Sequence, residues 1–86
     1  MDIENYRNFL AIIEAGSITG AAEIVHIAQP ALSKQLRALE QFYGTKLLLT
    51  ARGTRKIILT DAGRIVYQKA KYICSLEDLA RTETNH

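Results

Sequence analysis

Four polar side chains recur at spacings of three and four residues in the middle of the chain, namely Gln29, Ser33, Lys34 and Arg37. Residues at these spacings lie on one face of an α-helix. Their chemistry suits the edges of DNA bases, because glutamine can bond adenine at two atoms, lysine and arginine can bond guanine, and serine can bond either. Pro30 and Ala31 add apolar groups that can contact a thymine methyl group. The stretch therefore predicts a helix that reads base edges in the major groove.

The opposite face of this stretch is apolar and predicts burial against a core. Its members are Leu32, Leu36, Leu39 and Tyr43. We expect the helix to run from about Pro30 to Phe42, because proline suits a first helical turn and Gly44 suits a helix end.

Two shorter helices are expected before it. The first begins after Asp2, a good N-cap, and ends at Gly16. Its apolar stripe consists of Ile3, Tyr6, Phe9, Leu10 and Ile13. The second runs from about Gly20 to His26, and either Ser17 or Thr19 can cap it.

A break at about residues 27–28 joins the second and third helices. Two short helices joined in this way predict a helix-turn-helix, whose second member enters the major groove. Thr19 is a candidate for a contact to the DNA backbone, because free N–H groups at a helix N-terminus attract phosphate.

Two apolar runs, 47–49 and 57–59, flank the polar segment 51–56 and predict a β-hairpin. The hairpin tip carries Arg52, Arg55 and Lys56. A basic hairpin after a helix-turn-helix is a wing, which can contact the DNA backbone or a flanking minor groove. Residues 1–59 are therefore expected to form a mainly α, winged helix-turn-helix DNA-binding domain of three helices and a two-stranded wing.

A long final helix is expected within residues 60–86, capped by Thr60 and running to about Arg81. Its front half should pack on the core, whereas this small chain has nothing left to cover the rear half. An uncovered apolar stripe predicts a partner helix, antiparallel in a two-fold homodimer. The alternative is that the helix folds back onto its own core. The predicted dimer contacts are Val66, Ala70, Ile73, Leu76, Leu79 and Ala80.

Charge is distributed unevenly along the chain, although the net charge is only +2. Residues 34–71 contain nine Lys and Arg against two Asp and Glu. The segments 1–33 and 72–86 each contain one Arg and carry net charges of −3 and −2. A basic segment inside a folded domain is expected for a polyanionic partner, with a merely solvated basic surface as the alternative.

Composition limits the remaining possibilities. A chain of 86 residues is expected to be one small domain, with no apolar run long enough to span a membrane and no signal peptide. A single cysteine, Cys74, excludes an intrachain disulfide, favours a reducing cytoplasm and is expected to be a small buried hydrophobe. His26 and His86 are far apart, so we expect neither a metal nor a cofactor. Tyr67 and Tyr72 are interpreted as packing residues.

Three other classes of function were weighed against DNA binding. An enzyme is disfavoured, because the sequence contains no nucleophile elbow, phosphate-binding glycine loop or metal set. RNA binding would call for exposed aromatic residues that stack on bases. A protein-interaction module built on the same fold would be expected to show apolar residues where this chain has glutamine, serine, lysine and arginine.

Four motifs resemble the N-terminal domain of LysR-type transcriptional regulators. They are GlySerIleThrGlyAlaAla at 16–22, AlaGlnProAlaLeuSerLysGlnLeuArgAlaLeuGlu at 28–40, TyrGlyThrLysLeuLeu at 43–48 and LeuThrAspAlaGly at 59–63. The resemblance implies a bacterial transcription factor that binds an inverted repeat, with base contacts at the matching positions Gln29, Pro30, Ser33 and Lys34. It also implies that the last helix is the linker helix of a dimer.

The resemblance further implies a large C-terminal domain that binds a small effector and drives tetramerisation. The 86 residues do not include it, so we expect this chain to be the DNA-binding part of a longer regulator. Three residues depart from the family pattern: Ala28 replaces a frequent serine, Leu48 an aromatic residue and Thr50 an arginine. The wing is also expected to be one or two residues longer than usual, with Arg52 and Arg55 in place of the arginine.

Overall fold

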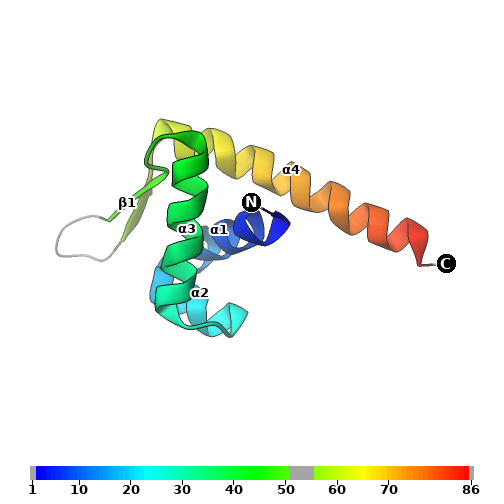
Figure 1. Ribbon diagram of the computed structural model, residues 1–86, viewed down its shortest axis with the longest axis horizontal. Helices are drawn as coiled ribbons and strands as arrows, with labels where there is room; N and C mark the ends of the chain where they lie inside the picture. Colours follow the sequence, from blue (N-terminus) through cyan, green and yellow to red (C-terminus); the bar gives the residue numbers. More distant parts are fainter. Residues whose placement is uncertain (1, 51–55, 86) are drawn as a thin grey trace.

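The computed structural model describes residues 2–50 and 56–85. In these residues the elements are α1 (Ile3–Ala15), α2 (Ile18–Val25), α3 (Gln29–Tyr43), β1 (Leu48–Thr50), β2 (Ile57–Leu59) and α4 (Asp61–Thr84) (Figure 1). The order confirms the predicted winged helix-turn-helix followed by a long helix. Two predicted wing residues, Arg52 and Arg55, lie outside the described residues.

Side chains and glycines set the ends of α1 and α2. The Asp2 carboxylate accepts a hydrogen bond from the Glu4 N–H at 2.9 Å, and Gly16 ends α1 in the left-handed conformation at φ 80°. Ser17 caps α2 by accepting from the Gly20 N–H at 2.9 Å. Thr19 therefore lies in the first turn, and α2 begins earlier than the predicted Gly20.

The first turn of α3 contains Pro30, as predicted, but its N-cap, Ala28, provides no side-chain hydrogen bond. Gly44 ends the helix at φ 72°. The helix is one residue longer at each end than the expected span of 30–42, a difference typical of helix ends.

The core lies where α1, α2, α3 and the front half of α4 meet. Its largest fully buried side chains are Phe9, Ile12, Leu32, Leu39 and Leu47. Burying a side chain of this size stabilises the fold by about 1.5–3 kcal/mol. Leu32 and Leu39 come from the predicted apolar face of α3, so this face fixes how the helix is turned.

Two predicted dimer contacts belong to this core instead. Val66 is 5% exposed and Ala70 is 0% exposed, so neither offers surface to a partner, and their assignment to a dimer interface was wrong. Together with Gly63 and Cys74 they recur every three or four residues and form the buried stripe of α4. Cys74 is buried, as predicted.

Hydrogen bonds join Thr60, the N-cap of α4, to the two residues before β1. The Thr60 N–H donates to the Leu47 carbonyl at 3.0 Å, and the Thr60 hydroxyl donates to the Lys46 carbonyl at 2.7 Å. The same hydroxyl oxygen caps the helix by accepting from the Gly63 N–H at 2.9 Å. A Cβ at Gly63 would lie 2.0 Å from the Leu47 carbonyl oxygen, so only glycine permits this approach.

Replacing Gly63 with alanine should therefore destabilise the chain. Helix propensity alone predicts a gain of about 1 kcal/mol from this change. The overlap with the Leu47 backbone should instead cost about 1–3 kcal/mol, as overpacking usually does. Urea unfolding followed by circular dichroism measures the sign, and a Gly63→Ala chain more stable than the unchanged one would contradict the close approach.

Candidate nucleic-acid interface

The predicted reading residues of α3 lie largely on its solvent side. Ser33 is half-buried, while the exposed members are Gln29, Pro30, Ala31, Lys34 and Arg37. The helix is held from behind by Leu32 and Leu39, which are fully buried. The structure thus places the six residues in the N-terminal two-thirds of one helix, largely on the side that faces away from the buried Leu32 and Leu39.

Thr19 lies beside the first of these residues. Its hydroxyl donates a hydrogen bond to Gln29 Oε1 at 3.3 Å, which links the first turn of α2 to the first turn of α3. Both side chains are exposed. The bond orients the Gln29 amide and leaves its NH₂ group as a donor and its oxygen with a second lone pair. An amide held in this way can still make two hydrogen bonds to one base.

Polar side chains of α1 form hydrogen bonds with α3. Asn5 Nδ2 donates to the Gln35 carbonyl at 3.2 Å, and the buried Asn8 amide bonds the Gln35 side chain. The Tyr6 and Tyr43 hydroxyls lie 2.7 Å apart at the C-terminal end of α3. Burial, with the Tyr6 contact second, raises the pKa of Tyr43 to about 12, so its hydroxyl stays protonated at neutral pH. The reading helix is therefore held at its middle and at its end.

A buried carboxylate joins α3 to the wing. Glu40 Oε2 accepts from the Leu47 N–H at 2.7 Å and from the Leu48 N–H at 3.3 Å. Sequence reasoning counted Glu40 only as an acid in a basic segment and missed this role. The signal available was its position four residues before Gly44, where the chain turns back towards the end of the helix.

The wing is a short antiparallel ladder that pairs Leu48 with Leu59, Leu49 with Ile58 and Thr50 with Ile57. Its first strand starts one residue later than the predicted run 47–49. Lys56, the predicted wing cation within the described residues, is exposed next to β2.

A groove separates α3 from the wing. Ser33 and Arg37 line it on the helix side, and Thr50 and Ile57 line it on the wing side. Lys46 also lines it and lies 3.8 Å from Glu40 Oε1, with most of its side chain in solvent. Lys46 is a cation at the interface that the sequence analysis did not select. The apolar side chains of Ile18, Leu36 and Leu48 line the rest of the groove together with Glu40, so Arg37 and Lys46 are the cations that it offers to a sugar-phosphate backbone.

The rear half of α4 carries the other predicted contacts. Leu76, Leu79 and Ala80 are exposed, and Ile73 is half-buried, so these four remain available to a partner. Tyr72, interpreted from the sequence as a packing residue, is 65% exposed, so most of its surface is not covered by the described residues. Ile65 is similarly exposed, and it falls seven residues before Tyr72 on the same helix side.

Within the described residues, no three His, Cys, Asp or Glu side chains are grouped to hold a metal ion. In the same residues, no helix has the length and apolar character that crossing a membrane requires.

Removing the Glu40 carboxylate should loosen the wing. Glu40→Ala leaves the Leu47 and Leu48 N–H groups without their acceptor, which should cost about 1–3 kcal/mol in unfolding free energy. Hydrogen exchange at these two amides should accelerate. Glu23→Ala, at an exposed acid on α2, is the matched control and should change stability by less than about 0.5 kcal/mol. Equal effects of the two substitutions would argue against the carboxylate as the link.

Comparison with known proteins identifies the same domain. Residues 3–64 match the family model described as bacterial regulatory helix-turn-helix protein, lysR family. The nitrogen assimilation regulatory protein nac of Escherichia coli is 44% identical over 73 residues, which cover 85% of this chain and 23% of that protein. HTH-type transcriptional regulator CatR of Pseudomonas putida is 38% identical, with 93% of this chain and 27% of that protein covered. The chain thus spans about a quarter of the length of these curated relatives.

A solved structure of similar fold contains DNA. The crystal structure of the BenM_DBD/benA site 1 DNA complex has a TM-score of 0.87 and 38% identity, and the alignment covers 98% of this chain and 95% of that one.

Proposed function

We propose that this chain, which belongs to the lysR family of bacterial regulatory helix-turn-helix proteins, binds double-stranded DNA at specific sequences through α3. The observation that carries the proposal is the exposed polar face of α3, fixed in place by the buried Leu32 and Leu39. The DNA complex formed by the BenM domain, which shares this fold over nearly its whole length, supports the same activity here.

In this proposal α3 enters the major groove and its exposed side chains contact bases. The residues assigned to base contacts are Gln29, Pro30, Ala31, Ser33, Lys34 and Arg37. Thr19, Lys46 and the wing cations Lys56, Arg52 and Arg55 contact the DNA backbone or a flanking minor groove. Phosphate contacts fix the register of the domain, and base contacts supply sequence information.

We assign the DNA contacts to residues 1–59 and the association of two copies to residues 60–86, which contain α4 (Asp61–Thr84). The front half of α4 packs on the DNA-binding part, and its rear half contacts the second copy. With Val66 and Ala70 in the core, the contacts to the second copy come from Ile73, Leu76, Leu79 and Ala80, together with Tyr72. A two-fold dimer presents two α3 helices related by symmetry, which suits an inverted-repeat site.

The complete regulator is proposed to act on the chromosome in the bacterial cytoplasm and to catalyse no reaction. Effector binding and tetramerisation are assigned to a C-terminal domain outside these 86 residues, since the matched part covers only about a quarter of the curated relatives.

Selection from random duplexes at near-physiological salt tests the proposal. An enriched inverted repeat is the expected result. Gln29→Ala or Ser33→Ala should then weaken binding to that site by about 1–3 kcal/mol and change binding to random DNA little. Equal losses on both kinds of DNA would mean that these side chains do not read bases.

Gln41→Ala is the matched control for this experiment. Gln41 is exposed on the same helix, but it lies twelve residues after Gln29 and therefore about 18 Å farther along the helix axis, beyond the bases that the first turns of α3 would contact. Its removal should leave the preference for the selected site unchanged. If the unaltered chain binds no DNA even at low salt, the proposed function is wrong.

A further inference from the structure

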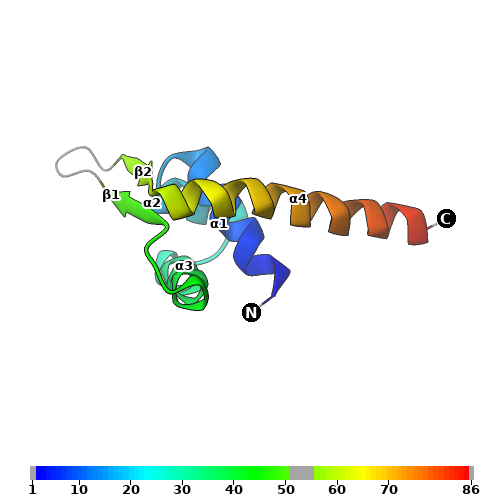
Figure 2. The same cartoon turned by 90° about the horizontal axis from the view of Figure 1, so that it is seen from above.

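The rear half of α4 leaves the domain almost without apolar support. The buried residues of this helix end at Cys74. Of the described residues 75–85, all are exposed except Glu77, whose side chain is 26% exposed. Figures 1 and 2 show the C-terminal part of α4 running out beyond the other elements. Apolar packing therefore ends about 15 Å before the helix does.

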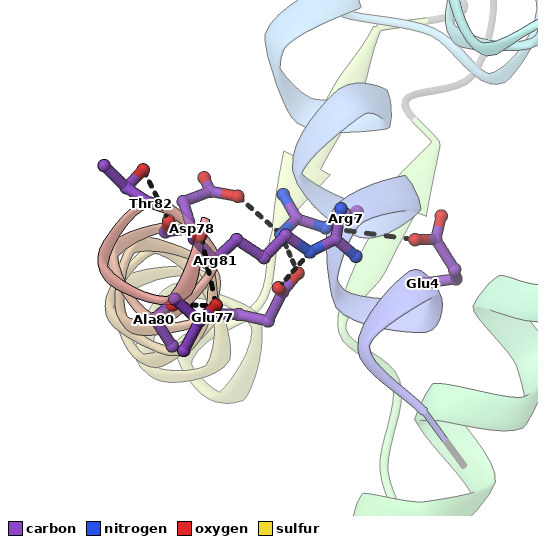
Figure 3. A network of polar contacts seen from close by, with 8 residues as sticks. Glu4, Arg7, Glu77, Asp78, Ala80, Arg81 and Thr82 are labelled. Carbon is purple, nitrogen blue, oxygen red and sulfur yellow. Dashed lines mark hydrogen bonds and ion pairs between the residues drawn. The ribbon is translucent and has the colours of Figure 1, made fainter. Parts of the chain in front are cut away.

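A charge cluster lies where this packing ends. Arg7 Nη2, from α1, donates to Glu77 Oε1 at 2.6 Å and to Asp78 Oδ1 at 2.8 Å (Figure 3). Arg81 also bonds Glu77, one helical turn farther along α4. Glu4 Oε1 lies 3.9 Å from Arg7 Nε and belongs to the same cluster.

The electrostatic environment favours the charged form of both central partners. The hydrogen bond from Arg7 lowers the pKa of Glu77, and the bonds to Glu77 and Asp78 raise the pKa of Arg7 further above its ordinary value. Burial raises the pKa of the neighbouring Cys74 thiol, which therefore stays neutral and adds no charge at neutral pH. Arg7 and Glu77 are therefore both charged at neutral pH, and the ion pair between them persists there.

Arg7 is the one lysine or arginine among residues 1–33, which also contain four acids. Without it, Glu77 would keep Arg81 as a partner, but the ion pairs that join α1 to α4 through Glu77 and Asp78 would be lost. The other ion pair near the start of α4, Arg64 with Asp61 at 2.5 Å, lies within one turn of α4 and is exposed, so it joins no two elements.

α1 therefore connects the reading helix to the rear of α4. Asn5 and Asn8 bond to Gln35 on α3, and Arg7 bonds to α4 from the neighbouring side of the same helix. We propose that Arg7 is a positioning residue that sets the angle at which α4 leaves the domain, and thereby the separation of half-sites that a dimer accepts. This inference rests on the proposed function, because it assumes two copies joined through the rear of α4 on an inverted repeat.

A distance measurement within one chain tests the role of Arg7 in the absence of DNA. Spin labels are placed at Glu14→Cys on α1 and Glu83→Cys on α4 in a Cys74→Ala background, and labelled chains are diluted with an excess of unlabelled ones. Arg7→Gln should broaden the distance distribution, and Asp78→Asn, at an exposed acceptor of the same cluster, should broaden it less. Arg64→Gln removes an equal charge from the local pair and should leave it unchanged. Identical distributions in Arg7→Gln and the unaltered chain would overturn the proposal.

Binding to spacer variants tests the consequence for DNA. The inverted repeat from the random-duplex selection is lengthened or shortened by single base pairs, each of which rotates one half-site by about 35° relative to the other. The unaltered chain should lose about tenfold in affinity per base pair, and Arg7→Gln about twofold, while affinity for an isolated half-site stays the same. Unchanged spacing preference in Arg7→Gln would sink the inference. Failure of the unaltered chain to bind the half-site would instead count against the proposed function, and the label distances would still decide the role of Arg7.

Discussion

The backbone of Leu47 is the point through which the three functional parts of the molecule are connected. Its N–H donates to Glu40 on α3, its carbonyl accepts from Thr60 before α4, and Gly63 lies directly against that carbonyl. Its side chain is fully buried in the common core. A buried backbone group without a partner is costly, so neither the wing nor the first turn of α4 can shift against α3 without breaking one of these contacts. The orientation of the exposed face of α3, which we propose reads DNA, follows from this junction.

The two faces of α3 interact with their surroundings in different ways. The buried face is held by apolar contacts that require only shape and volume, whereas the exposed face offers hydrogen-bonding groups that water satisfies when no DNA is present. Because Asn5 and Asn8 of α1 bond to Gln35 and Tyr6 bonds to Tyr43, polar contacts add to the apolar ones in holding the backbone of α3. A backbone that is already fixed before binding loses less entropy when the complex forms.

Periodicity and capping chemistry predicted the elements, their order and the exposed face of α3. They did not predict which side chains become buried or paired through contacts between elements that are distant in the sequence. Val66 and Ala70 share an apolar helix face with Leu76 in the sequence, but the domain covers only the front of that helix. Glu40 and Arg7 look like ordinary surface charges until the turn after Gly44 and the crossing of α1 and α4 supply their partners. Ser17 and Thr19 are equally good caps, and the residue that follows Gly16 directly is the one that serves.

Two features of α4 have complementary effects on how a pair of domains would be arranged. Contacts among Leu76, Leu79 and Tyr72 can hold two helices together, but apolar association is non-directional and does not fix how each domain is set relative to its helix. The Arg7 cluster is partly solvated, and such ion pairs add little to stability. Its hydrogen bonds are directional, however, and they act at the point where apolar packing of α4 onto the domain ends. In the proposed function, a dimer on an inverted repeat needs both a stable pair and a fixed geometry. Apolar residues of α4 provide the first, and the contact of Arg7 on α1 with Glu77 and Asp78 on α4 provides the second.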